Sequence, residues 1–273
     1  MKRAGWVLAF VALGAAGCAK KSAHPPRVET SCDDAAYNSC NHPPPGSSVP
    51  PKEAGPDGTA VPEAAPGDAS VSLAGSVSLL ASDDFVTVQA FSGTADITAE
   101  APGGGGASAS YNGQSFNIDD VRVGPSVWFS VTPTSNTGDA LPTLEPWDTT
   151  SPGYVVLRMV RSSVIDQIFN VVTLPPQRDA TRGQVVLHFV NASGNAVGGV
   201  GITQSPGTGV IYDAAGTWSD TAAGTGAAGF AIVVNAVPGF RQRVDLDTGS
   251  KLVYIQVQVA PGSVTLTDVP LAP

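Results

Sequence analysis

Charged residues, aromatic residues and cysteines are all scarce in this chain of 273 residues. Only 14% of its residues are charged and 7% are aromatic, and it has three cysteines. Charged residues make up about a quarter of an ordinary soluble protein. Asp and Glu outnumber Lys and Arg by 23 to 14, which gives a net charge of −9. We therefore expect no nucleic-acid partner, because that binding depends on basic side chains that contact phosphates.

Motifs of catalysis are also missing. The sequence has no G-x-S-x-G, no P-loop, no H-E-x-x-H and no G-x-G-x-x-G after an expected strand. The single histidine of the C-terminal two hundred residues is His188. A general base needs a nucleophile and an orienting partner, and the outward position of His188 on an expected strand favours a solvated surface residue. We predict no catalytic residue, no cofactor and no enzyme activity.

The N-terminus has the pattern of a targeting segment. Lys2 and Arg3 precede an apolar run at 6–13, which is shorter than the roughly 20 residues that span a bilayer. Small residues then lead to Cys18. Residues 1–17 and Cys18 resemble the signal peptide and lipobox of bacterial lipoproteins, although Ala15 stands where the usual pattern has Leu.

The lipoprotein resemblance implies cleavage before Cys18 and acyl chains on that cysteine. Several acyl chains together give stable membrane anchoring. Ala19 is not the Asp that signals inner-membrane retention in well-studied lipoproteins, so the resemblance favours the outer membrane of a bacterial cell envelope. The alternative is an ordinary signal peptide whose cleavage site lies beside a cysteine.

The segment at 18–69 is rich in Pro, Ala and Gly and lacks apolar periodicity. Such a composition cannot bury enough surface to offset the entropy of ordering, so we predict a disordered, extended linker. Cys32 and Cys40 lie within it. Disulfides persist in oxidising compartments, and these cysteines lack the C-x-x-C spacing of a metal or redox pair. We predict a disulfide between them.

Short β-branched runs separated by turn residues dominate the rest of the chain, and the pattern occurs twice. We predict a mainly β fold with two tandem antiparallel β-sandwich domains, at 70–160 and 178–273. In the first copy the runs are 74–79, 85–88, 116–118, 127–131 and 154–157; in the second they are 185–187, 197–202, 230–232, 241–246 and 252–259. Each copy also has a long Gly-rich stretch, at 92–112 and 205–228, which we interpret as a loop and a candidate recognition element.

The second copy resembles the carboxypeptidase regulatory-like domain, which is a transthyretin-like (prealbumin-like) β-sandwich. The resemblance covers 181–271, and the first copy matches more weakly. It implies a fold and not an activity. The residues that carry it are Gly183, Val185, Gly194, Val197, Gly199, Val200, Ile202, Gly229, Phe230, Ile232, Val237 and Gly239.

Alternation in the first strand of the second copy predicts which side chains face the core. Val185, Leu187 and Phe189 are expected to point inward, and Gln184 and His188 outward. The glycines that follow, Gly194, Gly198 and Gly199, are expected to allow a positive φ or a close approach of backbone.

One helix is expected, in a connector at 161–177 between the two copies. An apolar stripe at helical spacing predicts it, and Ser163 with Asp166 resembles a capping box. Pro175 and Pro176 would end it. The stripe consists of Val164, Ile165, Ile168, Phe169 and Val172. The alternative is that the preceding strand simply continues.

Aromatic residues are the candidate ligand contacts. Trp128 alternates with Val127, Phe129 and Val131, so it is exposed if those three form the core. Trp147 and Trp218 fall in expected loops, where binding residues concentrate. Tyr111 is the fourth candidate. Anchoring of loop ends by these rings is the alternative interpretation.

Paired acids occur at Asp83–Asp84 and Asp119–Asp120. Calcium takes six to eight oxygen ligands, but neither pair belongs to a calcium-binding pattern. Adjacent residues on a strand point to opposite faces, so we interpret these acids as solvated turn residues and predict no metal site.

These observations favour a non-enzymatic, lipid-anchored envelope or surface protein with a structural or protein-interaction role. Its partners would be the membrane, through the lipid, and an envelope protein or a glycan. One alternative is a carbohydrate- or polymer-binding module. Another is an accessory subunit of an envelope enzyme or secretion complex.

Overall fold

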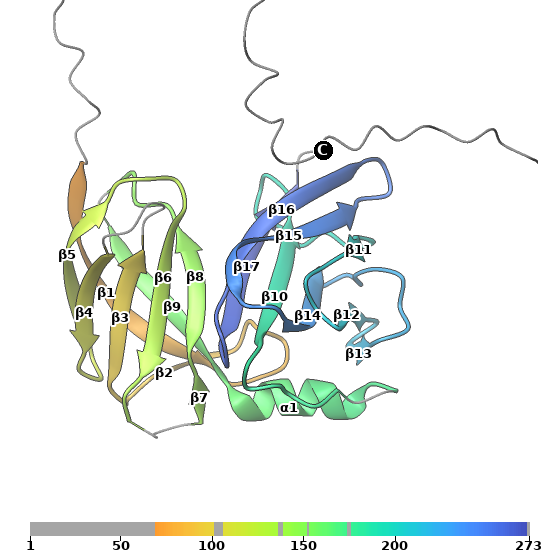
Figure 1. Ribbon diagram of the computed structural model, residues 1–273, viewed down its shortest axis with the longest axis horizontal. Helices are drawn as coiled ribbons and strands as arrows, with labels where there is room; N and C mark the ends of the chain where they lie inside the picture. The colour runs from red at the N-terminus through yellow and green to blue at the C-terminus, as the bar shows by residue number, and fades with distance from the viewer. Residues whose placement is uncertain (1–68, 101–105, 136–138, 152, 174–175, 272–273) are drawn as a thin grey trace, which may run out of the picture. The chain divides into compact units, whose positions relative to one another are not determined.

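The structure is a computed structural model that describes residues 69–100, 106–135, 139–151, 153–173 and 176–271 (Figure 1). Residues Glu63–Pro273 form one compact unit. The segment at 1–17, the linker up to residue 68, and Cys18, Cys32 and Cys40 all lie outside the described residues. Lipidation, the linker and the disulfide therefore stay predictions.

The described chain is mainly β, as expected. The strands before the helix are β1 (Ser70–Leu80), β2 (Val88–Ala90), β3 (Ala95–Glu100), β4 (Gly106–Tyr111), β5 (Phe116–Arg122), β6 (Val127–Pro133), β7 (Ala140–Leu141), β8 (Thr143–Trp147) and β9 (Tyr154–Arg161). After helix α1 (Ser162–Val171) come β10 (Gly183–Val190), β11 (Gly201–Gln204), β12 (Gly209–Ala214), β13 (Thr217–Ser219), β14 (Phe230–Ala236), β15 (Gly239–Asp247), β16 (Leu252–Val259) and β17 (Val264–Pro270).

Three sheets are formed, and the largest runs through both sequence copies. Its order is β13-β12-β14-β10-β17-β8-β6-β3-β4. The five-stranded sheet has the order β2-β1-β9-β7 with β5 also paired to β1, and the three-stranded sheet has the order β11-β15-β16. The join is the parallel pairing of β17 with β8, at Val264 with Thr143 and Thr265 with Leu144. The two copies are thus two cores within one compact unit, and their independence as domains stays a prediction.

The sandwiches are expected to be antiparallel, and most strand pairs are, but some pairs are parallel. Strands β1 and β9 are parallel, as are β10 and β17. In each copy the last strand returns beside the first after a long excursion, and a crossover of this kind produces a parallel pair. The strand that does this in the second copy, β17, was not among the expected runs.

Each copy has a core between facing sheets. In the first, inward side chains of the five-stranded sheet, such as Leu157, pack with those of β6 and β3, such as Phe129 and Ile97. In the second, Leu187 and Phe189 pack against Val244 and Leu246 of the three-stranded sheet. The alternation expected for the inward residues of β10 is therefore confirmed.

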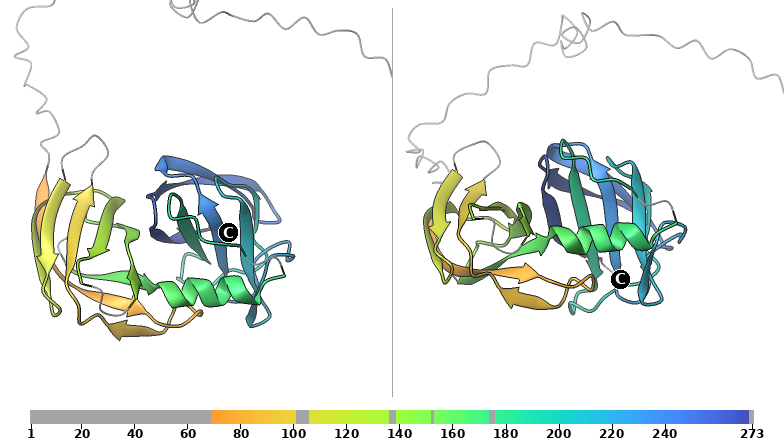
Figure 2. Two further views of the ribbon diagram at one scale, coloured as in Figure 1. Left: turned by 60° about the horizontal axis from the view of Figure 1, so that its bottom comes forward. Right: turned by 90° about the horizontal axis from the view of Figure 1, so that it is seen from below.

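A third cluster brings the two copies together around α1. The helix buries Val164, Ile165, Ile168 and Phe169. The cluster also contains side chains from both copies: Leu80, Phe85, Val160, Val186, Ile211, Trp218, Phe230, Ile232, Val234, Val264 and Leu266. Figure 2 shows α1 lying along one face of the C-terminal strands.

The helix itself was expected, but its capping was not. Arg161 is the N-cap residue and makes no side-chain capping bond. Asp139, from a separate segment, accepts a hydrogen bond from the Ser163 N–H at 2.9 Å and one from the Ser162 hydroxyl. Asp166 instead pairs with Arg178 at 2.9 Å. The expected Ser163–Asp166 capping box is therefore wrong, because a tertiary carboxylate occupies the N-terminus.

Both long Gly-rich stretches contain strands that the expectation of loops did not include. Residues 92–112 contain β3 and the described part of β4, which pair antiparallel. Residues 205–228 contain β12 and β13. Conversely, Phe85 lies in a turn with φ of 51°. Of the expected run at 85–88, only Val88 belongs to a strand, as the first residue of β2. The strands in the two Gly-rich stretches are rich in Gly, Ala and Ser, which have low strand propensity, so the sequence shows no clear alternation of large apolar residues.

Both faces of β10 are covered, so Gln184 does not point to solvent. It is buried, and its side-chain amide donates a hydrogen bond to Asn235 Oδ1 at 2.9 Å while its Oε1 accepts one from the Asn235 backbone. The expected outward exposure of Gln184 is wrong because the segment at 177–182 covers that side: Asn235, which bonds Gln184, also accepts the Asp179 N–H and donates to the Gln177 carbonyl. The expectation for the glycines is confirmed: Gly194 and Gly199 have positive φ, and a Cβ on Gly198 would lie 2.5 Å from the Gly226 carbonyl oxygen.

Among the described helical residues, no stretch is both long and apolar enough to cross a bilayer.

Candidate functional site

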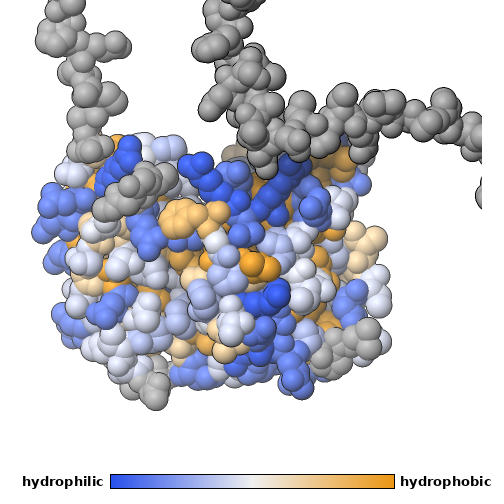
Figure 3. All heavy atoms as spheres, in the orientation of Figure 1, coloured by the Kyte–Doolittle hydropathy of each residue, from blue (hydrophilic) through white to orange (hydrophobic). Residues whose placement is uncertain are grey.

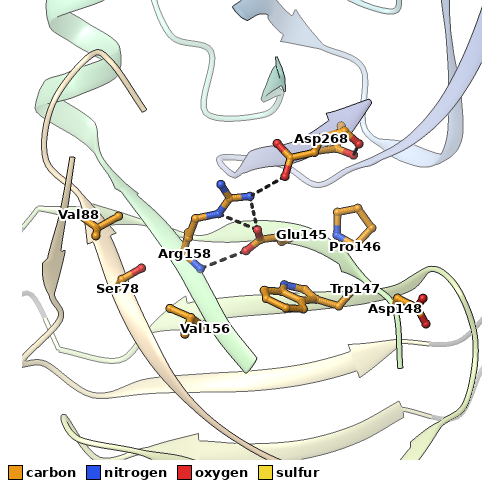
Figure 4. Close-up of a pocket in the computed structure, with 10 residues that line it drawn as sticks. Ser78, Val88, Glu145, Pro146, Trp147, Asp148, Val156, Arg158 and Asp268 are labelled. Carbon is orange, nitrogen blue, oxygen red and sulfur yellow. Dashed lines mark hydrogen bonds and ion pairs between the residues drawn. The ribbon is translucent and has the colours of Figure 1, made fainter. Parts of the chain in front are cut away.

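A pocket opens where β8 and β17 separate. The two strands pair at only two positions, and the next residues of β8 include Pro146, which has no N–H to extend a ladder. Strand β9 closes the third side, and the volume is about 440 Å³. The lining is drawn in Figure 4; it consists of Ser78, Val88, Glu145, Pro146, Trp147, Asp148, Val156, Arg158, Thr267 and Asp268.

Glu145 and Arg158 form the floor of this pocket. Glu145 is 4% exposed. Its Oε1 accepts hydrogen bonds from Arg158 Nε at 2.7 Å and from Arg158 Nη2, and its Oε2 accepts the Arg158 backbone N–H at 3.1 Å. The carboxylate therefore caps the edge of β9 where a neighbouring strand would otherwise pair, and the same side chain fixes the guanidinium (Figure 4).

Burial and charge act in opposite directions on this pair. Burial raises the pKa of the Glu145 carboxyl, and the Arg158 guanidinium with its hydrogen bonds offsets only part of that rise. For Arg158, burial alone would lower the pKa, but the Glu145 and Asp268 carboxylates raise it above its ordinary value. The guanidinium accordingly keeps its charge, and the pair depends on both partners being present.

The network continues from the pocket to His188. Asp268 Oδ2 lies 3.9 Å from Arg158 Nη2, and its Oδ1 lies 2.9 Å from His188 Nδ1. The imidazole stacks on Phe230 with ring centroids 4.3 Å apart. Four strands, β8, β9, β17 and β10, thus contribute one side chain each to a row of interacting polar groups where the two copies meet.

His188 is therefore not a free surface residue. Its side chain is 25% exposed and is held by Asp268 and Phe230. An Asp–His pair can orient an imidazole for general-base chemistry when a nucleophile is in reach. The contacts of this imidazole with Asp268 and Phe230 hold it in place, so the arrangement supports positioning of side chains rather than a defined reaction.

We predict that Asp268 titrates below an ordinary aspartate. The hydrogen bond with His188 lowers the pKa of Asp268, and burial opposes that shift. Since the folded-state pKa is lowered, the stabilisation from this carboxylate is complete above about pH 4 and is lost as pH falls through the lowered pKa. NMR titration of the Asp268 carboxyl checks the direction, and Asp268→Asn should flatten this acid limb. A pKa for Asp268 above that of model aspartate would contradict it.

The four aromatic candidates occupy different places. Trp147 lies in β8 and lines the pocket. Trp128 is half-buried and packs against the second core, because its neighbours Phe129 and Val131 fill the first. The expectation that Trp147 lies in a loop and that Trp128 is exposed is thus wrong, although contact of Trp147 with a ligand stays a prediction.

Trp218 and Tyr111 are core residues. Trp218 belongs to β13, not to a loop, and is 6% exposed, with its ring edge-on to Phe85 at 5.8 Å. Tyr111 is 3% exposed, and its hydroxyl donates to the Phe91 carbonyl at 2.8 Å. Both rings bury most of their apolar surface inside the fold, as the alternative interpretation of anchoring expects, and the exposed remainder of Trp218 lines a pocket.

The paired acids behave as turn and strand-bulge residues. Asp84 accepts hydrogen bonds from the Val86 and Thr87 backbone N–H groups, both at 2.8 Å. Asp119 and Asp120 are both exposed on β5. They share this exposure because Asp120 has φ of 60°, which breaks the alternation that we expected. Within the described residues no group of three or more His, Cys, Asp or Glu side chains could hold a metal ion.

Sequence reasoning missed Glu145, Arg158 and Asp268. Each is a charged residue inside a strand of otherwise apolar or small residues. In a chain with so few charges, that placement was the available signal, since a buried charge must be paired. The partners follow from tertiary contacts: β9 packs beside β8 and pairs Arg158 with Glu145, and the parallel pairing of β10 with β17 sets His188 opposite Asp268.

Comparisons with known proteins add little. No protein family matches this chain, and no curated protein matches it significantly. Among solved structures it is similar to the Bacillus anthracis TIE protein, with 10% identity over 74% of this chain and a TM-score of 0.22, and it covers 34% of that protein, about a third of its length. A Streptococcal ancillary pilin (10% identity, 74% of this chain and 69% of that one) and the shaft pilin SpaA from Lactobacillus rhamnosus GG (8%, 75% and 98%) also have TM-scores of 0.22.

Superpositions at that score carry no argument about this protein. The resemblance to carboxypeptidase regulatory-like domains accordingly stays a prediction from residues 181–271. What can be said of function rests on the chain itself.

Proposed function

We propose that this chain is a non-enzymatic protein of the bacterial cell envelope, anchored by a lipid on Cys18, with a structural or protein-interaction role. The observation that carries the proposal is the order of its parts. A basic start, a short apolar run and small residues lead to Cys18, a Pro-rich segment follows, and one compact, mainly β unit comes last. An acylated N-terminus anchors such a unit, and the segment between sets its reach.

The chemistry of the pocket supports a role without catalysis. The Glu145 carboxylate accepts three hydrogen bonds from Arg158, and the Asp268 carboxylate is hydrogen-bonded to His188. Groups that serve as acids or bases present a free lone pair or proton to the substrate. Here these groups hold strands together, so the surface around them is better suited to recognition than to a reaction.

The exposed surface supports an interaction role as well. Figure 3 shows hydrophobic side chains interspersed among hydrophilic ones on the face drawn. Large exposed apolar residues include Tyr154 and Val156 of β9, beside the pocket, and Tyr254 of β16. Interfaces that form and dissociate are about as apolar as the rest of a protein surface, so a mixed surface of this kind can form one.

Replacing Cys18 with serine tests the anchor. We expect the wild-type protein to sediment with membranes and to incorporate a labelled fatty acid, and the Cys18→Ser variant to lose both properties, because the thioether forms on the thiol. Cys32→Ser is the matched control and should keep both. Unchanged membrane association of Cys18→Ser, without label in the wild type, would show that the chain is not a lipoprotein.

A glycan-binding role is the second candidate, and Trp147 is the observation that favours it. Its indole lies beside Asp148 and the Glu145–Arg158 pair at the pocket (Figure 4), and a ring next to charged hydrogen-bonding groups suits a sugar. We expect Trp147→Ala to lose retention on purified cell-wall polymer, whereas Tyr254→Ala, a substitution of an exposed ring away from the pocket, keeps it. Equal retention of both variants would count against this role.

A further inference from the structure

A second pocket, of about 550 Å³, lies on the other side of His188. Ligand pockets are commonly of about 300–1,000 Å³. The turn after β1 forms one side of it, and the other lining residues come from β10 and the turn after it, the hairpin of β12 and β13, and the start of β14. The turn after β1 belongs to the first copy and the other parts to the second, so neither copy alone contains this site.

One wall of this pocket is a continuous row of rings. Phe230 and Trp218 line it, and His188 stacks on Phe230. Phe85 supports the row from behind: its ring centroid lies 5.7 Å from that of Phe230 and 5.8 Å from that of Trp218. Each ring is held by another ring, so this wall is formed before any ligand arrives.

The acidic side chains of the lining are not balanced by any Lys or Arg. Asp83, Asp84 and Asp213 line the pocket, and no Lys or Arg belongs to its lining. Asp213 is held as a fixed acceptor by the backbone N–H groups of Phe230 at 2.8 Å and Ala228 at 3.1 Å.

Asp83 is the carboxylate with spare capacity. It accepts a 3.5 Å hydrogen bond from Ser82 Oγ, whereas an ionised carboxylate has about four acceptor sites. Its side chain is half-buried at the pocket rim. Aromatic faces and carboxylates both attract cations.

We propose that this pocket binds an organic cation whose apolar body contacts Trp218 and Phe230 and whose ammonium group pairs with Asp83 and Asp84. An anionic ligand would meet three carboxylates, and a neutral apolar ligand would leave them unused. This inference goes beyond the proposed envelope role, and it holds or fails independently of the lipid on Cys18.

Two probes of nearly equal shape separate charge from shape. The full-length chain is titrated with 2-phenylethylammonium and with neutral 2-phenylethanol, and binding is followed by the indole N–H resonance of Trp218, assigned with Trp218→Phe. We expect saturable binding of the amine at least about tenfold tighter than that of the alcohol, the ratio that about 1.4 kcal/mol of charge pairing produces. Added salt should weaken the amine only, because the rim carboxylates are screened.

Substitution of the rim carboxylate localises the effect. Asp83→Asn should weaken the amine by roughly tenfold and leave the alcohol unchanged. Asp119→Asn, which removes an equal charge from another exposed acid pair, is the matched control and should change neither. Circular dichroism of each variant confirms folding. Equal affinity for amine and alcohol, unchanged binding in Asp83→Asn, or no shift of the Trp218 resonance would each overturn the proposal.

Discussion

Replacing Arg158 with alanine is expected to lower the free energy of unfolding by about 3–5 kcal/mol, which is the usual cost of leaving a buried charge without its partner. Glu145 is 4% exposed and receives three hydrogen bonds from this one residue, two of them from the guanidinium that the substitution removes. The Arg158 side chain is 29% exposed and that of Glu145 is 6% exposed, so most of the pair is removed from water in the folded chain. Urea denaturation of the wild type and the variant measures the difference.

The dependence on pH identifies the cause. Burial already raises the pKa of Glu145, and loss of the guanidinium must raise it further. A protonated carboxyl needs no countercharge, so the destabilisation in Arg158→Ala should shrink as pH falls through the raised pKa of Glu145 and be largest near neutrality. Glu145→Gln in the same background should restore much of the loss.

A surface pair provides the control. Arg243 lies 2.6 Å from Asp245, but its side chain is 62% exposed. Exposed ion pairs contribute little because solvent screens them, so Arg243→Ala should leave stability nearly unchanged. A loss in Arg158→Ala that is independent of pH, or no larger than that in Arg243→Ala, would show that burial of Glu145 is not the reason for this pair.

The strands and helix that were predicted correctly are those whose pattern is local. Val127, Phe129 and Val131 alternate with polar or aromatic neighbours, and β6 buries all three. The helix stripe at Val164 and Ile168 is likewise a property of neighbouring turns. A period of two or of 3.6 residues can be seen in a single sequence because it needs no knowledge of partners.

What could not be predicted depends on contacts between distant segments. Strand β8 meets β17 across about 120 positions of sequence at Thr143 and Val264, and that junction brings Asp268 to the Glu145–Arg158 pair. Asp139 caps α1 from outside the helix. The alternation of β10 correctly placed Val185 and Leu187, but it could not show that Asn235 and the segment at 177–182 would bury Gln184 on the opposite face.

The candidate aromatic residues show the same limit. Trp218 looked like a loop residue because glycines surround it, yet β13 pairs with β12 and turns the ring inward. Phe85 was assigned to a strand because of its composition, whereas it lies in a turn and inserts its ring between the two copies. Burial of a ring is decided by which segments fold over it, and no short motif contains that information.

Phe85→Ala is expected to be the most damaging single truncation at the contact between the copies, at about 3–5 kcal/mol of unfolding free energy. The ring is 4% exposed and lies against Trp218 and Phe230. Its backbone has φ of 51°, a conformation that is unfavourable for a bulky L-residue. A turn retains such strain only if the buried side chain compensates for it, so the ring must contribute more than the strain costs.

That reasoning fixes an unusual order of stability among the variants. Glycine relieves the left-handed strain that alanine keeps, which is worth about 1–2 kcal/mol, so Phe85→Gly should be more stable than Phe85→Ala. Val86→Ala is the neighbouring control; Val86 is 69% exposed and its truncation should have little effect. Thermal and urea unfolding of the three variants measures these differences. An alanine variant as stable as the wild type would mean that the Phe85 ring does not join the two copies. An alanine variant more stable than the glycine variant would mean that the turn is not strained.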